Sequence, residues 1–571
     1  MSRHGSKGRH RSGRRKSTTG KRLAAAGRWL QRRTVRRVWA ARLLVATALV
    51  CGVGFAGWSG YRAVVGEPIE RLSDPWHRSH RIVDRTGKPL RELTSHLGQR
   101  GQPLPLEAMG DRLVVATLVS EDKRFYRHTG VDLEAIARAL GQNARHVRIV
   151  SGASTVTQQL VKLLDHGGKP PRDRSLGDKL HEAARAQNLE QQLTKREILE
   201  AYLNRLSYGR GCVGPASAAA LMFGVSPADL SWAQAALLAV LPRAPTYLDP
   251  YQHRERSVVR QRALLTALHD QGWLSEADQT RALSEPLELR PMRHPFAAPH
   301  LTEALRLVAL GERGRLSAGD VTTTTLDLVL QRDVEGLVVS HRARLAGRRA
   351  DNAAVLVVDN DSGEVLAYVG SADFDDPEIA GQIDMARARR QPGSTLKPFL
   401  YALAFERGLQ PSEVLADVAT RFGERSGAYQ PDNFDGTFYG PVSAREALAG
   451  SLNVPAVRLA AQVGADDLLA LLRSLGMASL DREGTHYGLS LALGSGEISL
   501  HELVEAYVAL ARGGDRIAVH TTVDDPATLG QPRPAGEQLI DPAAAAAVTD
   551  SLSDPLARVR GLGGTGPFDL G

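Results

Sequence analysis

Two short segments carry more polar side chains than an apolar core accommodates. One runs from Glu121 to Gly130 and the other from Gly152 to Lys162. Gln158 and Gln159 stand side by side, so they cannot both face an apolar interior. We therefore interpret the second segment as the lining of a site for a polar, anionic ligand, built from Ser154, Thr155, Thr157, Gln158, Gln159 and Lys162.

An acid and several cations near these segments suit the transfer of a group away from an anion. Glu121 follows an apolar stretch and is a candidate general base. A Glu-Asp pair is more often the solvated end of a helix, so this interpretation depends on the neighbouring segment. Cations that suit an anionic leaving group follow at Lys162, Arg172, Arg174, Lys179 and Lys195.

A second group of residues suits nucleophilic catalysis. Ser394 and Lys397 are three residues apart, so at the start of a helix both project to one face. A lysine shielded from water can accept the proton of such a serine. Ser-x-x-Lys is common in unrelated proteins, but Ser451 and Asn453 follow at a distance that suits the same site.

The chain around the first group follows a helical pattern. Between residues 195 and 204 the apolar side chains share one helical face. Ser231 precedes an apolar stretch that ends at Pro242, which predicts a capped and largely buried helix. We expect a mainly helical domain over residues 104–250.

The chain on either side of this domain is richer in strand signals. Thr86-Gly87 and Asn360–Gly363 each lie between short apolar runs, which predicts a turn at the first place and a β-hairpin at the second. We expect a connector over residues 63–103, a linker with helices over 251–320, and a second, α+β domain over 321–571.

The N-terminal tail is strongly basic and runs into an apolar stretch. Residues 1–42 carry 15 Lys/Arg and no Asp or Glu, and the rest of the chain carries 57 Lys/Arg against 63 Asp/Glu. The uncharged stretch from Leu43 to Tyr61 would rise about 28 Å as a helix, close to the thickness of a hydrocarbon layer. We predict a single transmembrane helix over residues 43–62 and a cytoplasmic tail. A cleaved signal peptide and a nucleic-acid-binding tail are the alternatives, but attraction to anionic lipid headgroups needs no further assumption.

The first group of residues resembles the motifs of glycosyltransferase family 51, the peptidoglycan polymerases. Glu121, Phe125, His128 and Gly130 fit the first motif, and residues 152–162 fit the second. The remaining motifs are matched by Lys179, Glu182, Ala186, Leu189-Glu190, residues 198–204, Gly209, Gly214, Ala218-Ala219 and residues 237–245.

This resemblance implies a lysozyme-like helical fold and a reaction on lipid II. It assigns Glu121 as the base and Glu182 as the second acid, with Lys162, Arg174 and Lys179 as contacts of the pyrophosphate. The products would be β-1,4-linked glycan strands, and a divalent cation such as Mg²⁺ is a candidate cofactor at the phosphates. The third motif usually opens with Arg-Lys, whereas this chain has Asp178 before Lys179, which removes one cation.

Ser394, Lys397, Ser451 and Asn453 resemble the transpeptidase motifs of class A (bifunctional) penicillin-binding proteins, closest to their C-type branch. Residues 429–435 and 488–494 strengthen this resemblance. It implies a penicillin-binding fold similar to the serine β-lactamases, with Ser394 accepting the acyl group of a stem peptide or a β-lactam.

The third transpeptidase motif, Lys-Thr-Gly, is missing from this sequence. Lys397 is the last lysine, and Gly564-Thr565-Gly566 lacks the lysine. We therefore expect an incomplete, C-terminally truncated transpeptidase domain that is poorly stable and impaired in acyl transfer.

Taken together, the sequence predicts a membrane-anchored polymerase. The resemblance implies a single-pass protein of the cytoplasmic (inner) membrane, with periplasmic catalytic domains and a possible cell-wall synthesis complex as partner. Two alternatives stay open. One is an inactive scaffold that binds lipid II or β-lactams, and the other is a lysozyme-like glycan hydrolase.

Overall fold

The chain divides into two compact units in the computed structural model. One unit contains residues 117–203, together with the N-terminal part of the chain up to Asp74, and the other contains residues 75–116 and 204–571. The domain expected over residues 104–250 therefore contributes to both units. The structure describes residues 42–49, 51–52, 55, 58–60, 62, 72, 78–95, 97–138, 154–167, 176–292, 294–311, 321–345, 347–424, 427–533 and 535–562.

The stretch predicted to cross a membrane is described only in part. Residues 42–49 are helical, and so are several short pieces between residues 51 and 62. Within the described part of the chain, no helix has both the length and the apolar character needed for a membrane span.

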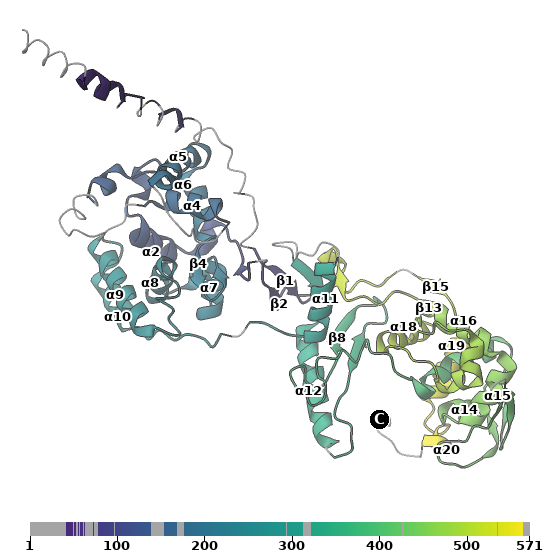
Figure 1. The fold of residues 1–571 in the computed structure, drawn as a ribbon. Coiled ribbons are helices and arrows are strands. Elements are labelled where there is room, and N and C mark those ends of the chain that lie inside the picture. Colours follow the sequence, from purple (N-terminus) through teal and green to yellow (C-terminus); the bar gives the residue numbers. More distant parts are fainter. Residues whose placement is uncertain are drawn as a thin grey trace, which may run out of the picture. The chain divides into compact units, whose positions relative to one another are not determined.

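Helices α4, α5 and α6 pack against one another in the first unit (Figure 1). In α6 the apolar face predicted from the sequence is buried, as it is formed by Ile198, Leu199, Tyr202 and Leu203. Gly130 has a φ of +87°, and a Cβ at this position would meet the backbone of Ala186 in α5 at 2.8 Å. Only glycine allows this close approach. The boundary between the two units falls within α2 (Asp111–Glu121). The other elements of this unit are η3 (Phe125–Arg127), α4 (Val156–Asp165), α5 (Leu176–Gln192) and α6 (Lys195–Leu203).

In the second unit, residues 78–116 and 204–311 combine helices with short strands. The predicted turn at Thr86-Gly87 joins β1 to β2 in an antiparallel pair, and β1 also pairs in parallel with β6. Helix α8 begins after Ser231 with a capping box, as the sequence predicts. The elements are β1 (His80–Val83), β2 (Pro89–Leu93), β3 (Arg100–Gly101), η2 (Leu106–Met109), β4 (Ser207–Gly209), β5 (Cys212–Val213), α7 (Pro215–Met222), η4 (Pro227–Asp229), α8 (Trp232–Val240), η5 (Leu241–Arg243), α9 (Arg254–Asp270), α10 (Glu276–Ser284) and α11 (Pro299–Gly311).

Residues 321–562 form the α+β part that the sequence predicts. β7 and β8 form the expected antiparallel hairpin. The elements are β6 (Val321–Thr324), α12 (Leu328–Arg344), β7 (Val355–Val358), β8 (Val365–Val369), η6 (Gly393–Leu396), α13 (Lys397–Glu406), β9 (Val414–Asp417), β10 (Phe422–Glu424), β11 (Gly427–Tyr429), β12 (Gly440–Ser443), α14 (Ala444–Ala449), α15 (Asn453–Val463), α16 (Ala465–Ser474), α17 (Gly484–Tyr487), η7 (Gly488–Leu493), α18 (Leu500–Ala511), β13 (Asp515–Arg516), β14 (Thr522–Val523), η8 (Pro526–Thr528), β15 (Glu537–Gln538), α19 (Pro542–Ser553) and α20 (Val559–Leu562).

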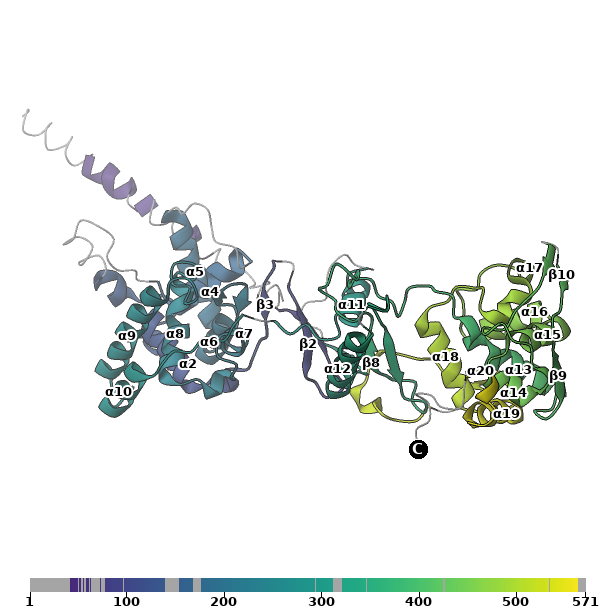
Figure 2. The same cartoon turned by 90° about the horizontal axis from the view of Figure 1, so that it is seen from below.

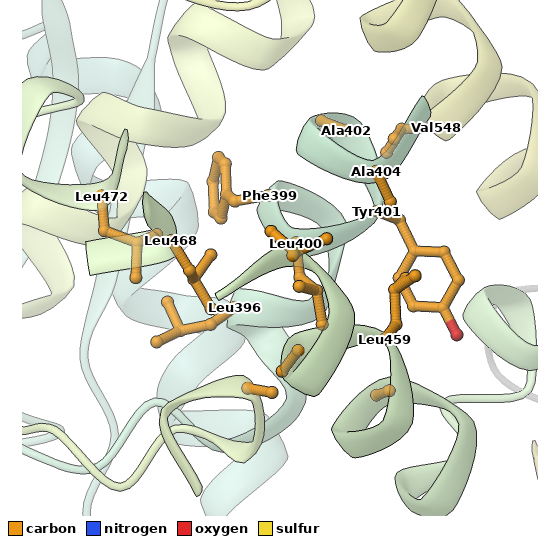
Figure 3. Packing of buried hydrophobic residues seen from close by; sticks show 14 of the residues in the cluster. Leu396, Phe399, Leu400, Tyr401, Ala402, Ala404, Leu459, Leu468, Leu472 and Val548 are labelled. Atoms are coloured by element: carbon orange, nitrogen blue, oxygen red, sulfur yellow. The ribbon is translucent and has the colours of Figure 1, made fainter. Parts of the chain in front are cut away.

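Helix α13 lies at the centre of the core of this part. It packs against α15, α16 and α19, which gather around it in Figure 2. Leu396, Phe399 and Leu400 are fully buried and face leucines of α15 and α16 (Figure 3). The residues that begin α13 are therefore held by a well-packed core.

Candidate active sites

The carboxylate of Glu121 lies at the end of α2 and is bonded by Gln159, which Tyr202 supports in turn. The amide of Gln159 in α4 donates a hydrogen bond of 3.0 Å to Glu121. The hydroxyl of Tyr202 in α6 donates to the Gln159 carbonyl at 2.9 Å. Glu121 itself is half-buried. A chain of neutral donors thus fixes the acid while one side of it stays accessible.

The neighbouring acid, Asp122, belongs to the fold. Its carboxylate is buried and accepts the backbone N–H of Val156 at 3.0 Å, at the start of α4. It also forms a pair with the Nε2 atom of His128 at 3.0 Å. Asp122 therefore ties the first turn of α4 to the end of α2, and it leaves Glu121 as the acid of the pair that can meet a substrate.

Three residues expected to line the ligand site instead build the start of α4. Thr155 is buried and caps the helix, because its hydroxyl accepts the N–H of Gln158 and donates to the Gly130 carbonyl at 2.6 Å. The Gln158 side chain completes the capping box. The hydroxyl of Thr157, also buried, donates to Glu190 of α5 at 2.6 Å. The hydroxyls of Thr155 and Thr157 and the side-chain carbonyl of Gln158 are thus engaged within the fold, and their role as ligand contacts stays a prediction.

The other predicted binding residues have a more open environment. Ser154 is exposed just before the cap, and Lys162 is half-buried on α4. Lys179 is exposed near the start of α5. Arg172 and Arg174 lie outside the described residues. The site thus has Ser154, Lys162 and Lys179 as polar groups that remain partly accessible.

Glu182 lies on the inward face of α5. It is half-buried, and Ala186 and Leu189, which share its helical face at spacings of four and seven residues, are fully buried. Further along the helix, Glu190 contacts both Thr157 and the amine of Lys195, the latter at 2.7 Å. Helix α5 packs against α4, which carries Gln159, the hydrogen-bond partner of Glu121.

Sequence reasoning missed the part played by Tyr202. Its place on an apolar helix face made it a core residue, and its ring is indeed fully buried. A buried tyrosine hydroxyl still requires a hydrogen-bond partner. That requirement was the signal that could have connected Tyr202 with a polar site.

The second group of predicted residues comes together around a buried amine. Lys397 begins α13 and is only 1% exposed. Its Nζ donates to the Ser451 carbonyl at 2.6 Å, to the Ser451 hydroxyl at 3.2 Å and to Asn453 Oδ1 at 2.8 Å. Ser394 is exposed on the turn of η6 that leads into α13. The predicted association of Lys397, Ser451 and Asn453 is present in the structure.

Burial changes the acidity of this amine. Desolvation lowers the pKa of Lys397 from its ordinary value of 10.5 to about 7. A substantial fraction of the amine is then neutral near neutral pH and can accept a proton. Within the described residues no hydrogen bond joins Lys397 to Ser394, so the transfer requires the serine hydroxyl to turn toward the amine.

Two features of the backbone shape this site. Ser451 has a φ of +54°, in the left-handed region that non-glycine residues seldom adopt. Gly494, at the end of the predicted motif 488–494, lies against the turn that carries Ser394. A Cβ on Gly494 would meet the backbone nitrogen of Gly393 at 2.3 Å. A glycine at position 494 is therefore needed for the close approach of this segment to Gly393, next to Ser394.

Residues 564–566, which carry Thr-Gly without the lysine of the third transpeptidase motif, lie outside the described residues. The prediction that the transpeptidase domain is truncated therefore stays a prediction.

Comparison with known proteins gives two family matches along the chain. Residues 86–269 match the family described as Transglycosylase. Residues 353–562 match the family described as Penicillin binding protein transpeptidase domain. Both candidate sites fall inside these ranges.

Several curated relatives match most of the chain. Penicillin-binding protein 1C of Escherichia coli (strain K12) is 37% identical over 446 residues, which cover 78% of this chain and 56% of the relative. Penicillin-binding proteins 2D and 1F of Bacillus subtilis (strain 168) are each 30% identical; the alignments cover 74% and 77% of this chain and 61% and 60% of those proteins. The chain thus spans between half and two thirds of the length of these relatives.

The order of the two domains and the relatives agree with the resemblance inferred from the motifs. The chain belongs to the class A penicillin-binding proteins, which join a transglycosylase domain to a penicillin-binding transpeptidase domain.

Proposed function

We propose that this protein polymerises lipid II into β-1,4-linked glycan strands. The observation that carries the proposal is the half-buried carboxylate of Glu121, fixed through Gln159 and Tyr202 within the transglycosylase match. A positioned carboxylate with one accessible side is what a general base requires.

In this reaction Glu121 accepts the proton of the acceptor sugar hydroxyl. The hydroxyl oxygen forms a bond to the anomeric carbon of the lipid-linked strand as the bond from that carbon to the pyrophosphate breaks. The configuration at the anomeric carbon inverts, and undecaprenyl pyrophosphate leaves. Lys162, Lys179 and Arg174 are assigned to the pyrophosphate, and Glu182 to the orientation of the reacting groups.

A divalent cation has no evident site in the described part of the chain. No group of three or more His, Cys, Asp and Glu residues there is arranged to hold a metal ion.

A second activity is assigned to the transpeptidase match. Lys397 accepts the proton of Ser394 as the serine oxygen forms an ester with the acyl carbon of a stem peptide or a β-lactam. In a stem peptide the amide bond to the terminal D-alanine breaks, and that amine leaves with a proton.

We also place the protein in the cytoplasmic membrane. The basic tail and the apolar stretch over residues 43–62 support a single-pass anchor, a cytoplasmic N-terminus and periplasmic catalytic domains. A cell-wall synthesis complex is a fitting partner for such a polymerase. Resistance of the protein to carbonate extraction from membranes, together with protease access only from the periplasmic side, would support this placement; release into the soluble fraction would contradict it.

The test of the polymerase is incubation of the detergent-purified chain with labelled lipid II, followed by separation of the products by length. We expect long products that a muramidase cleaves to disaccharide units. Shortening of added glycan instead of polymer growth would identify a hydrolase. Binding of lipid II by a folded protein without any product would identify a scaffold.

A further inference from the structure

A buried carboxylate lies behind the Lys397 site. Asp417, the last residue of β9, is fully buried, and no lysine or arginine of the described residues forms an ion pair with it. Its two oxygens accept the side-chain amide of Asn433 at 2.9 and 2.8 Å, and one of them accepts the N–H of Tyr439 at 2.8 Å. A buried charge without a cation needs such hydrogen bonds, so Asp417 constrains its partners strongly.

Asn433 transmits this constraint to the start of α15. Its Nδ2 faces Asp417 and also donates to the Thr437 carbonyl at 2.8 Å. The orientation of the amide is thereby set, and Oδ1 must point the other way. That oxygen accepts the N–H groups of Asn453 at 2.8 Å and Val454 at 3.3 Å, which are unsatisfied donors of the first helical turn.

Asn453 in turn presents its own oxygen to the amine. Its Nδ2 donates to the Asp432 carbonyl at 2.9 Å, which leaves Oδ1 for Lys397 Nζ at 2.8 Å. A continuous series of hydrogen bonds thus runs from Asp417 through Asn433 and Asn453 to Lys397.

We infer that Asp417 and Asn433 are positioning residues of the transpeptidase site, which hold Asn453 as a fixed acceptor beside the Lys397 amine. Neither residue reaches the amine itself. They act by keeping the helix start closed over Lys397, so that water does not take the place of the protein acceptors. This inference rests on the geometry of the site and is independent of whether the chain acylates.

The test is a pH titration of Lys397 in the full chain, followed by NMR of ¹³Cε-labelled lysine and assigned with Lys397→Met. Asp417→Asn keeps the shape of the side chain but places an NH₂ group opposite Nδ2 of Asn433. Two donors then face each other, so one of the two amides must rotate. We expect the helix start to loosen and water to enter, and the pKa of Lys397 to rise from about 7 by about one unit or more toward 10.5.

The sign of this shift separates positioning from simple electrostatics. Removal of a negative charge disfavours a cation, so Asp417→Asn acting only through its charge would lower the pKa of Lys397. An unchanged or lowered pKa in the folded variant would overturn the inference.

A second variant and a control complete the test. Asn433→Ser leaves Asp417 in place but breaks the contact with Asn453. It should also raise the pKa of Lys397. If Asp417→Asn does not fold, the result for Asn433→Ser decides the test. Gln331→Ala removes another fully buried amide, which bonds the backbone of Tyr368. It should destabilise the same α+β part without moving the titration of Lys397. An equal shift in this control would reduce Asp417 and Asn433 to ordinary structural residues.

Discussion

The two candidate sites of this protein hold their proton acceptors in opposite ways. Glu121 is half-buried at the end of a helix and is held by the neutral amide of Gln159. Lys397 is almost fully buried and is surrounded by oxygens of Ser451 and Asn453. The first arrangement leaves the base open to a hydroxyl that a substrate brings. The second keeps the base away from solvent, and the hydroxyl assigned to it, that of Ser394, belongs to the protein itself.

This difference predicts different consequences of substitution. Changes around Glu121 should affect the rate of the reaction more than stability, because its side chain bears little of the core. Changes at Lys397 should affect stability and its dependence on pH, because burial of the amine is itself costly.

The largest effect is expected for Glu121→Gln. The amide retains the shape but cannot accept the proton, so the initial rate of lipid II polymerisation should fall by about 10²–10⁴-fold. Glu255→Gln, at an exposed position on α9, is the matched control and should retain the full rate. A loss of less than about threefold in a folded Glu121→Gln protein would remove Glu121 from the role of base.

The next effect concerns Lys397→Met and the pH dependence of stability. The unfolded chain keeps the lysine proton up to about pH 10.5, whereas the folded chain releases it near pH 7. Between these values the unfolded state binds more protons, so the free energy of unfolding of the α+β part should rise with pH, by roughly 5 kcal/mol in total.

In Lys397→Met this rise should disappear, and below pH 7 the variant should gain stability relative to the unchanged protein. Urea unfolding, monitored by protease cleavage in the α13 region and repeated from pH 6 to pH 10, measures the stability of both proteins as a function of pH. Parallel curves for the two proteins would show that Lys397 does not titrate as described.

A smaller effect is expected when the support of Glu121 is removed. Gln159→Leu breaks the hydrogen bonds to both Glu121 and Tyr202, and we expect kcat for polymerisation to fall by about tenfold with little change in KM. Tyr202→Phe removes only the outer hydroxyl and should cost less. If Tyr202→Phe lowered kcat more than Gln159→Leu, the order of this chain of contacts would be wrong.

The smallest effect is expected for Thr155→Ala. Loss of the cap of α4 should lower stability by about 1 kcal/mol and increase hydrogen exchange in the first turn of α4. Because the Thr155 hydroxyl is engaged within the fold, KM for lipid II should hardly change. A marked rise in KM without loss of stability would instead show that Thr155 contacts lipid II.

Local patterns in the sequence predicted much of this fold. The cap at Ser231, the apolar face of α6 and the turns at Thr86-Gly87 and Asn360–Gly363 all depend on residues close together in the chain, and the structure confirms them. The short strands β4 and β5 within the expected helical domain were missed, because two or three residues carry no visible periodicity.

The roles of single polar residues were harder to predict. A polar segment that caps a helix looks the same in sequence as one that lines a ligand site, so the capping role of Thr155 and the contact of Thr157 with Glu190 were not predicted. The contacts of Asp417 with Asn433 and of Asn433 with Asn453 join residues 16 and 20 positions apart. Such pairs depend on the packing of separate elements, and no local pattern reveals them.

The central claim is that polymerisation depends on Glu121 and is separate from the Ser394 site. The most direct measurement is the length distribution of products from labelled lipid II with the unchanged chain, Glu121→Gln and Ser394→Ala. We predict equal polymer from the unchanged chain and Ser394→Ala, and about 10²–10⁴-fold slower polymer formation by Glu121→Gln. Polymer formation by Glu121→Gln within about threefold of the unchanged chain, or loss of polymer in Ser394→Ala, would contradict the claim.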